Sequence, residues 1–207
     1  MKGRSVALYV AGAIIVLLLL IYHVPDVANL FHVDHMVSST LDHEEYVVVE
    51  EYDNKQEAAN ILAKINQMFV RVITHLKRNR MNGPYAEQIV YLASNYSPIV
   101  LGEHIPTNLK FTSYVAQKGV KIRMCLRPIE NRRIFHDMNT LKFVALHELS
   151  HLAVRSYGHD ESFWSMFRFI LLEASSIGEI KLVDYSKFPQ PYCGLPNDIR
   201  DNPAIGH

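Results

Sequence analysis

Hydrophobic positions recur every three or four residues between residues 55 and 78 of this 207-residue chain. This is the spacing of an amphipathic α-helix, in which such positions fall on one face. The apolar face comprises Ala58, Ile61, Leu62, Ile65, Phe69, Val72, Ile73 and Leu76. We therefore expect a long helix that packs against the rest of the domain, followed by a shorter helix at about residues 85–95.

Other segments favour strands. Residues 45–53 (EYVVVEEYD) and 120–126 (VKIRMCL) contain β-branched side chains, and the second segment follows a glycine. We expect a strand in each, the first at the edge of a sheet, and short strands near residues 99–101 and 111–115. Together with the helices, these strands predict an α+β fold with a small mixed sheet.

A nearly continuous apolar stretch at residues 143–154 predicts a buried helix. Asp137 or Asn139 can cap its first turn, and Gly158 suits the left-handed position that ends many helices. Another helix is expected over residues 161–176, where the apolar side chains are Phe163, Trp164, Met166, Phe167, Phe169, Ile170 and Leu171. Asp160 can cap it.

The polar residues of the first of these two helices form the motif His147-Glu148-Leu149-Ser150-His151. One helical turn separates the histidines, so both imidazoles project from one face and can hold one zinc ion. Glu148 is rotated by about 100° from His147. Its carboxylate can therefore act as general base toward a zinc-bound water at the metal's open coordination position. The motif predicts one Zn²⁺ per chain and hydrolysis of a peptide or amide bond.

A catalytic zinc site usually has a third protein ligand. His159 follows directly after Gly158, the expected end of the helix, and can fold back onto the metal. The alternative ligand is Glu173 on the next helix, the arrangement of gluzincins. Glu173 follows His151 by twenty-two positions, which is longer than the spacing common in gluzincins. We favour His159 as the third ligand.

The stretch HELSHLAVRSYGHDESFW at residues 147–164 resembles the WLM metallopeptidases and, more distantly, the SprT-like ones. In these families an HExxH helix is followed by Gly-His or Pro-His, an acidic residue and a Phe-Trp-like pair. Residues 119–127 (GVKIRMCLR) and 101–106 (LGEHIP) are similar to the WLM strand before the active-site helix and to its Glu-x-x-Pro turn. One departure is the spacing of seven residues between the second and third histidines, which is longer than usual in that family.

The resemblance implies a zincin-like metalloprotease domain that acts on protein or peptide substrates. By that match His147, His151 and His159 are the zinc ligands, and Glu148 is the catalytic acid/base.

The resemblance also bears on the strands. In zincins an edge strand runs above the metal and pairs with extended substrate, so the strand from Lys121 to Arg127 is a candidate for substrate binding, with a purely structural strand as the alternative. Some WLM proteins carry SUMO-interacting motifs, which Val47-Val48-Val49 with its following acids also resembles. An edge strand explains the latter segment without a partner.

The segment from Val6 to Tyr22 has no charged residue and predicts a single transmembrane helix, with a cleaved signal peptide as the alternative. Lys2 and Arg4 precede it, and no further Lys or Arg appears until Lys55. The positive-inside rule then places the N-terminus in the cytoplasm and the catalytic domain on the opposite face. We expect an anchor at residues 1–22, a spacer at 23–44 and a zincin-like domain at 45–207.

The net charge of the chain excludes few classes of function. The chain is formally neutral, and the part beyond the anchor has nineteen basic and twenty-one acidic side chains, which gives no independent sign of nucleic-acid binding. Cys125 and Cys193 can form a disulfide in an oxidising compartment or be two buried thiols, and we favour the thiols.

Two functions fit these observations. The first is a membrane-anchored zinc metalloendopeptidase. The second is a catalytically silent domain that zinc stabilises and that serves as a membrane-tethered structural or binding protein. Glu148 favours the first, because a purely structural site has no use for a general base and usually has four cysteine-rich ligands.

Overall fold

The computed structural model describes residues 35–97, 101–106, 113–116, 121–156, 158–185 and 187–194. The expected membrane anchor from Val6 to Tyr22 lies outside these residues. Within them, no helix combines the length and the hydropathy needed to cross a bilayer.

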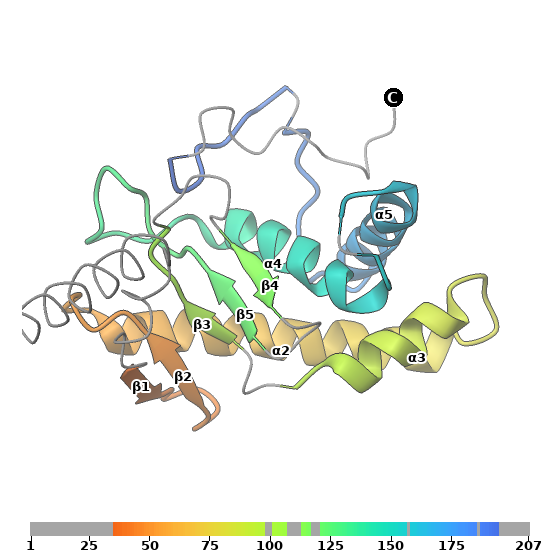
Figure 1. Ribbon diagram of the computed structural model, residues 1–207, viewed down its shortest axis with the longest axis horizontal. Helices are drawn as coiled ribbons and strands as arrows, with labels where there is room; N and C mark the ends of the chain where they lie inside the picture. The colour runs from red at the N-terminus through yellow and green to blue at the C-terminus, as the bar shows by residue number, and fades with distance from the viewer. Residues whose placement is uncertain are drawn as a thin grey trace, which may run out of the picture. The chain divides into compact units, whose positions relative to one another are not determined.

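The sheet has five strands in the order β1-β2-β3-β5-β4. Strands β2, β3 and β5 are parallel, whereas β1 and β4 lie at the two edges and run antiparallel to their neighbours (Figure 1). The strands are β1 (His35–Ser38), β2 (Glu45–Val48), β3 (Leu101–Glu103), β4 (Tyr114–Ala116) and β5 (Lys121–Met124). The small mixed sheet expected from the sequence is therefore present.

The domain begins earlier than the sequence predicts. Strand β1 lies in the expected spacer, where it pairs with β2, and the compact unit starts at His35. The turn after β1 is tied to the long helix, because the Ser39 hydroxyl and the Thr40 amide both donate to Asn60 Oδ1 at 3.0 Å. Since β2 lies between β1 and β3, it is not an edge strand, and its backbone cannot pair with a SUMO-like partner.

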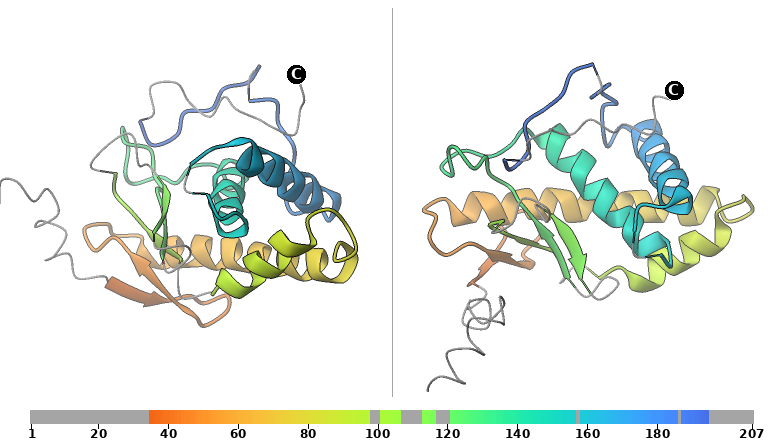
Figure 2. Two further views of the ribbon diagram at one scale, coloured as in Figure 1. Left: turned by 45° about the vertical axis from the view of Figure 1, so that its right-hand side comes forward. Right: turned by 45° about the horizontal axis from the view of Figure 1, so that its top comes forward.

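Within the described ranges, four helices accompany the sheet: α2 (Lys55–Asn79), α3 (Ala86–Asn95), α4 (Met138–Ala153) and α5 (Glu161–Ser176). Their positions confirm the predicted helices, apart from the end of α4. All eight apolar positions predicted for the face of α2 are buried. Helix α2 contacts the sheet through β1, β2 and β3 and also contacts the other three helices (Figure 2). It is the element on which the rest of the domain packs.

Gly102 marks a close approach of two strands. In the sheet it lies between Val47 of β2 and Arg123 of β5. A Cβ atom at this position would lie 2.9 Å from Val47 Cβ and 2.8 Å from a guanidinium nitrogen of Arg123. Only glycine fits without displacing a neighbour.

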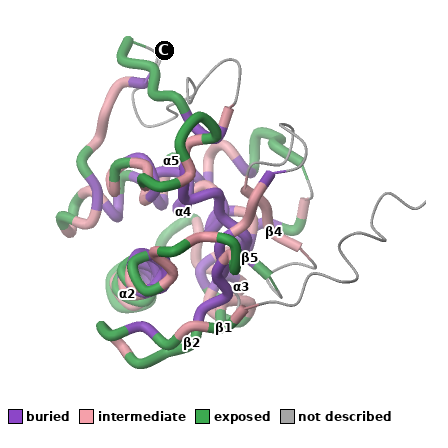
Figure 3. The backbone as a smooth tube through the Cα atoms, turned by 90° about the vertical axis from the view of Figure 1, so that its left-hand side faces the viewer, coloured by how far each residue is buried: buried purple, intermediate pink, exposed green. Residues whose placement is uncertain are grey.

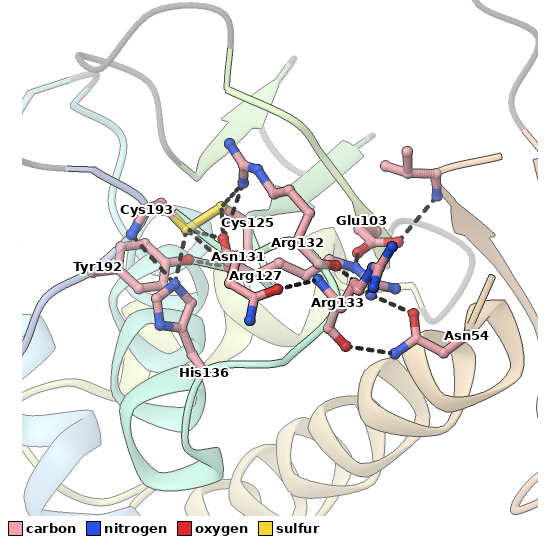
Figure 4. A network of polar contacts seen from close by, with 11 residues as sticks. Asn54, Glu103, Cys125, Arg127, Asn131, Arg132, Arg133, His136, Tyr192 and Cys193 are labelled. Carbon is pink, nitrogen blue, oxygen red and sulfur yellow. Dashed lines mark hydrogen bonds and ion pairs between the residues drawn. A yellow bond between two sulfur atoms is a disulfide. The ribbon is translucent and has the colours of Figure 1, made fainter. Parts of the chain in front are cut away.

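A buried ion pair fastens the end of β3 to the loop after β5 (Figure 4). Arg127 donates through Nε to Glu103, and both side chains are 1% exposed. The second carboxylate oxygen of Glu103 accepts the backbone N–H of Val49 at 3.0 Å. The Arg127 guanidinium also lies over the rings of Tyr52 and Phe135, at 4.5 and 4.1 Å from their centroids. The charges of Arg127 and Glu103 are thus paired, which offsets the free-energy cost of removing them from water.

The two cysteines are bonded to each other. Cys125 follows β5, and Cys193 lies in the irregular segment near the C-terminus, sixty-eight positions later. Both side chains are buried, as expected of thiols, but the preference for free thiols was wrong. Sequence spacing could not reveal the pairing, because it depends on where the C-terminal segment crosses the fold.

Candidate active site

Helix α4 begins at a strong side-chain cap. The Asp137 carboxylate accepts the backbone N–H groups of Asn139 and Thr140, each at 2.9 Å, and the Thr140 hydroxyl at 2.6 Å. These bonds satisfy backbone donors that have no partner within the helix. Asn139, the other candidate cap, instead exchanges two hydrogen bonds with the backbone of Lys181. It holds the segment after α5 against the start of α4.

Helix α4 is buried along much of its length (Figure 3), and two histidines lie in its second half. His147 and His151 are one turn apart, and their ring centroids lie 5.2 Å from each other. Both side chains are only partly buried, whereas Glu148 between them is 5% exposed. The helix therefore turns both imidazoles toward one accessible face, whereas the carboxyl group of Glu148 is buried.

The helix ends at Ala153, five residues before the predicted end at Gly158. Val154 is extended, with φ −115° and ψ 153°, and Gly158 does not adopt the expected left-handed conformation. The side-chain amide of Asn95 in α3 donates to the carbonyl of Leu152 at 3.2 Å and so satisfies one of the terminal carbonyls. The prediction failed because Val154 is buried in the core like the helix residues before it, so the apolar pattern continues past the end of the helix.

His159 returns to the face of α4 after this change of direction. Its Nε2 lies 2.9 Å from Nε2 of His147, and its ring centroid lies 4.9 Å from that of His151. Ligand atoms of the three histidines all lie within 4.8 Å of one another. Asp160, the next residue, caps α5 by accepting the N–H of Phe163 at 2.9 Å. This cap fixes the backbone beside His159.

Glu173 lies elsewhere, in a polar contact between α5 and α2. Its carboxylate bonds His75 Nε2 at 2.8 Å and Arg80 Nε at 2.9 Å. Although burial alone would raise the pKa of Glu173, the hydrogen bonds from Arg80 and His75 lower it below its ordinary value. The described residues group His159, and not Glu173, with the two histidines of α4.

The donor set fits a zinc ion. Two nitrogens bound tetrahedrally at about 2.0–2.1 Å from zinc are about 3.3 Å apart, close to the 2.9 Å between His147 and His159. Burial, together with the proximity of His151 and His159, lowers the pKa of His147 to about 3. The ring is therefore neutral near pH 7, which is the form that binds a metal.

Glu148 is the ionisable carboxyl group of the motif. Burial raises its pKa to about 8, because the ionised carboxylate would lose its hydration inside the protein. A carboxyl group that titrates near the working pH can both accept and return a proton. Glu148 combines this property with a position in the sequence next to His147.

Aromatic side chains of α5 form a wall around the histidines. The Phe163 ring stacks on His151 at 4.2 Å between centroids, Phe167 lies 5.2 Å from His147, and Trp164 lies 5.5 Å from His159. From the sequence these aromatic residues were interpreted as the apolar content of a helix, and the Phe163-Trp164 pair as part of the family motif, but none of them was assigned to the site. The signal that could have assigned them to the site is their position. They follow His159 and the helix cap Asp160 closely in the sequence, and they recur at helical spacing.

The candidate substrate strand needs correction. Strand β5, within the predicted segment from Lys121 to Arg127, pairs with β3 on one side and β4 on the other, so its backbone groups are already used. The edge on this side of the sheet is β4, which also contacts α4. Sheet order cannot be read from local sequence, and the pairing of β5 on both sides favours the alternative of a purely structural strand.

Known proteins match this region and most of the domain. The profile of the WLM domain family matches residues 86–183, which include α4 and α5. Protein R325 of Acanthamoeba polyphaga mimivirus is 33% identical over 167 residues, which cover 78% of this chain and 81% of that protein. Protein 042R of Invertebrate iridescent virus 3 is 30% identical over 148 residues, which cover 60% of this chain and 90% of that one.

Among solved structures, Wss1 from Saccharomyces cerevisiae aligns with a TM-score of 0.48 and 21% identity, over 64% of this chain and 88% of the yeast chain. The family profile spans all three histidines and Glu148, and the mimivirus protein matches over most of both chains. The chain belongs to the WLM domain family.

Proposed function

We propose that this protein is a zinc metalloendopeptidase. The observation that carries the proposal is the convergence of His147, His151 and His159, with the buried carboxyl group of Glu148 adjacent to His147 in the same helix. Three imidazole ligands would leave one position of a tetrahedral ion open, which is typical of catalytic zinc sites. Membership of the WLM family supports the same chemistry.

Each residue has a distinct task in the proposed reaction. The three histidines would hold zinc, which when bound supplies a Lewis acid that lowers the pKa of water and polarises the scissile carbonyl group. Glu148 takes the proton of the attacking water and passes it to the departing amine. The aromatic wall made by Phe163, Trp164 and Phe167 limits access of bulk water to the histidines.

Strand β4 is the proposed binding edge for the substrate backbone. Among the described residues, it pairs only with β5 and so has one side free for an extended peptide. A peptide that adds to this side would lie along the strand that contacts α4. Such binding recognises backbone groups, which suits an endopeptidase with broad sequence tolerance.

The second candidate is a catalytically silent zinc-stabilised domain. It is less well supported, because the histidine group among the described residues has three members and no cysteine, whereas structural zinc sites usually close with four ligands. A buried ionisable carboxyl group beside the ion would also have no use in a structural site.

Four substitutions in the full chain test the proposal. Glu148→Gln should retain about one zinc per chain but lower peptide hydrolysis by about 10²–10⁴-fold, the usual contribution of acid–base assistance. His147→Ala should lose zinc and activity together. His159→Ala should lose zinc, whereas its matched control Glu173→Ala should retain it. If Glu148→Gln cleaves peptides as fast as the parent protein, the enzymatic proposal fails and the structural-zinc alternative stands.

A membrane anchor at Val6 to Tyr22, with the domain on the non-cytoplasmic face, stays a prediction from charge and hydropathy. Protease added to the cytoplasmic side of intact vesicles should leave the domain uncut until detergent is added. Digestion before detergent would show that the assigned orientation is wrong.

A further inference from the structure

The disulfide anchors an irregular segment near the end of the described residues. Residues 187–191 are exposed, and the next two residues, Tyr192 and Cys193, are buried. Cys193 also has a positive φ of 50°, a conformation that is unfavourable for residues other than glycine. The bond to Cys125 therefore holds a short buried stretch in place after an exposed one.

Tyr192 lies beside the disulfide of Cys125 and Cys193 (Figure 4) and connects this stretch to the proposed substrate edge. Its hydroxyl donates to the carbonyl of Cys125 at 2.8 Å and lies 2.6 Å from the hydroxyl of Ser113. Ser113 Oγ in turn accepts the N–H of Cys125 at 3.1 Å. Because Ser113 immediately precedes β4 and Cys125 immediately follows β5, the phenol fastens the start of β4 to the end of β5.

His136 adds a contact between the same stretch and the active-site helix. Its Nε2 accepts the N–H of Cys193 at 3.3 Å and lies 3.2 Å from the Cys193 sulfur. Its ring centroid is 5.0 Å from that of Tyr192, and the next residue, Asp137, caps α4. The stretch thus contacts Ser113, directly before the edge strand β4, and His136, directly before the cap of α4.

We propose that Tyr192 is a positioning residue for β4 and that the Cys125–Cys193 disulfide makes this positioning dependent on reduction. A dithiol would supply two electrons and two protons. The bond between the two sulfurs breaks, two thiols form, and the dithiol becomes a disulfide. Without the bond, the positive φ of Cys193 favours release of the stretch, and β4 loses the hydroxyl contacts that align it.

The part of this inference that concerns substrate rests on the proposed function, but the positioning itself can be measured without activity. Hydrogen exchange of the β4 amides in the full, zinc-treated chain should be at least tenfold faster after reduction by dithiothreitol. Tyr192→Phe keeps the disulfide and removes the hydroxyl, so its β4 amides should exchange faster even when oxidised. Tyr185→Phe is the matched control, because Tyr185 is also buried but its hydroxyl lies near Asn139 and not near β4.

Steady-state kinetics then tests the consequence for substrate binding. Reduction and Tyr192→Phe should each raise KM several-fold and change kcat by a smaller factor, since the histidines are unchanged although the phenol interacts electrostatically with Glu148. In a Cys125→Ser, Cys193→Ser double variant, dithiothreitol should have no further effect on exchange or KM. A parent protein without any protease activity but with faster β4 exchange on reduction would sink the proposed function and leave the positioning role intact.

Two results would overturn the inference. One is complete reduction, verified by alkylation of both cysteines, with β4 exchange unchanged. The other is uptake of a second zinc ion by the reduced chain with β4 still protected, because Cys125, His136 and Cys193 would then hold the stretch as metal ligands.

Discussion

Replacing Glu148 with glutamine should stabilise the metal-free protein at alkaline pH, although the same change should abolish most catalysis. The reason is that Glu148 is 5% exposed and must lose its hydration to ionise inside the folded domain. The folded pKa is about 8, above the ordinary value of 4.5. The folded state therefore keeps a proton that the unfolded chain releases, and stability falls as pH rises through this window.

The size of the effect follows from the two pKa values. A difference of one unit corresponds to about 1.4 kcal/mol. With pKa values of 4.5 and about 8, the ionisable group costs about 4 kcal/mol at pH 8 but only about 1 kcal/mol at pH 5. Glutamine removes this cost. For a domain of this size, the stabilisation at pH 8 corresponds to a rise in Tm of about 10 °C.

The assay is thermal unfolding by circular dichroism in the presence of a chelator, at pH 5 and pH 8. The low pKa of His147 also makes stability fall as pH drops below 6.5, but this effect is common to the variant and the parent and cancels in their difference. Glu173→Gln is the matched control with the opposite sign. The folded pKa of Glu173 is lowered, so its charge stabilises the protein above its ordinary pKa, and the substitution should lower Tm at pH 8.

An increase in Tm that is equal at both pH values would refute the reasoning, because it would show that ionisation of Glu148 is not the cause. A lower Tm for Glu148→Gln at pH 8 would show that the carboxylate is stabilised in the folded protein by a partner or by water.

Three further predictions concern the rest of the domain. Trp164 is the only tryptophan and lies beside the histidines, so Co²⁺ should quench its fluorescence in the parent protein but not in a variant without the histidines. Gly102→Ala should lower the unfolding free energy in urea by about 1–3 kcal/mol through overpacking, whereas Gly158→Ala, with no atom within 4 Å of its added Cβ, should stay within about 0.5 kcal/mol of the parent. Arg127→Met should lower the free energy of unfolding in urea by about 3–5 kcal/mol, because Glu103 would be left buried without its partner. Adding Glu103→Gln to the same chain should recover much of this loss.

The sequence was most informative where local chemistry decides the structure. Helix α5 occupies the predicted residues because Asp160 caps its start and the aromatic spacing defines its buried face. The two histidines of α4 share a face because they are one turn apart, and that relation depends on no other part of the chain. The proximity of His159 followed from its place just after the helix, even though the helix ends earlier than expected.

Features that depend on contacts between distant segments could not be predicted from the sequence in the same way. Whether β4 or β5 forms the edge depends on the order of strands, and no local pattern records that order. The bond between Cys125 and Cys193 depends on the course of the C-terminal segment. Strand β1 was missed because its four residues alternate between partly buried and exposed positions and contain too few apolar side chains to give a strand pattern.

The location of His159 has a consequence for the lifetime of a bound ion. Two of the proposed ligands belong to a buried helix, whereas His159 is exposed and lies in an irregular stretch between α4 and α5. Dissociation would therefore begin at His159, while the helix still retains the ion through the other two rings. The rate at which a chelator extracts zinc should follow the local opening of this stretch, which is faster than unfolding of the domain. Asp160→Ala, which removes the adjacent helix cap, should accordingly shorten the residence time of zinc more than it lowers the Tm.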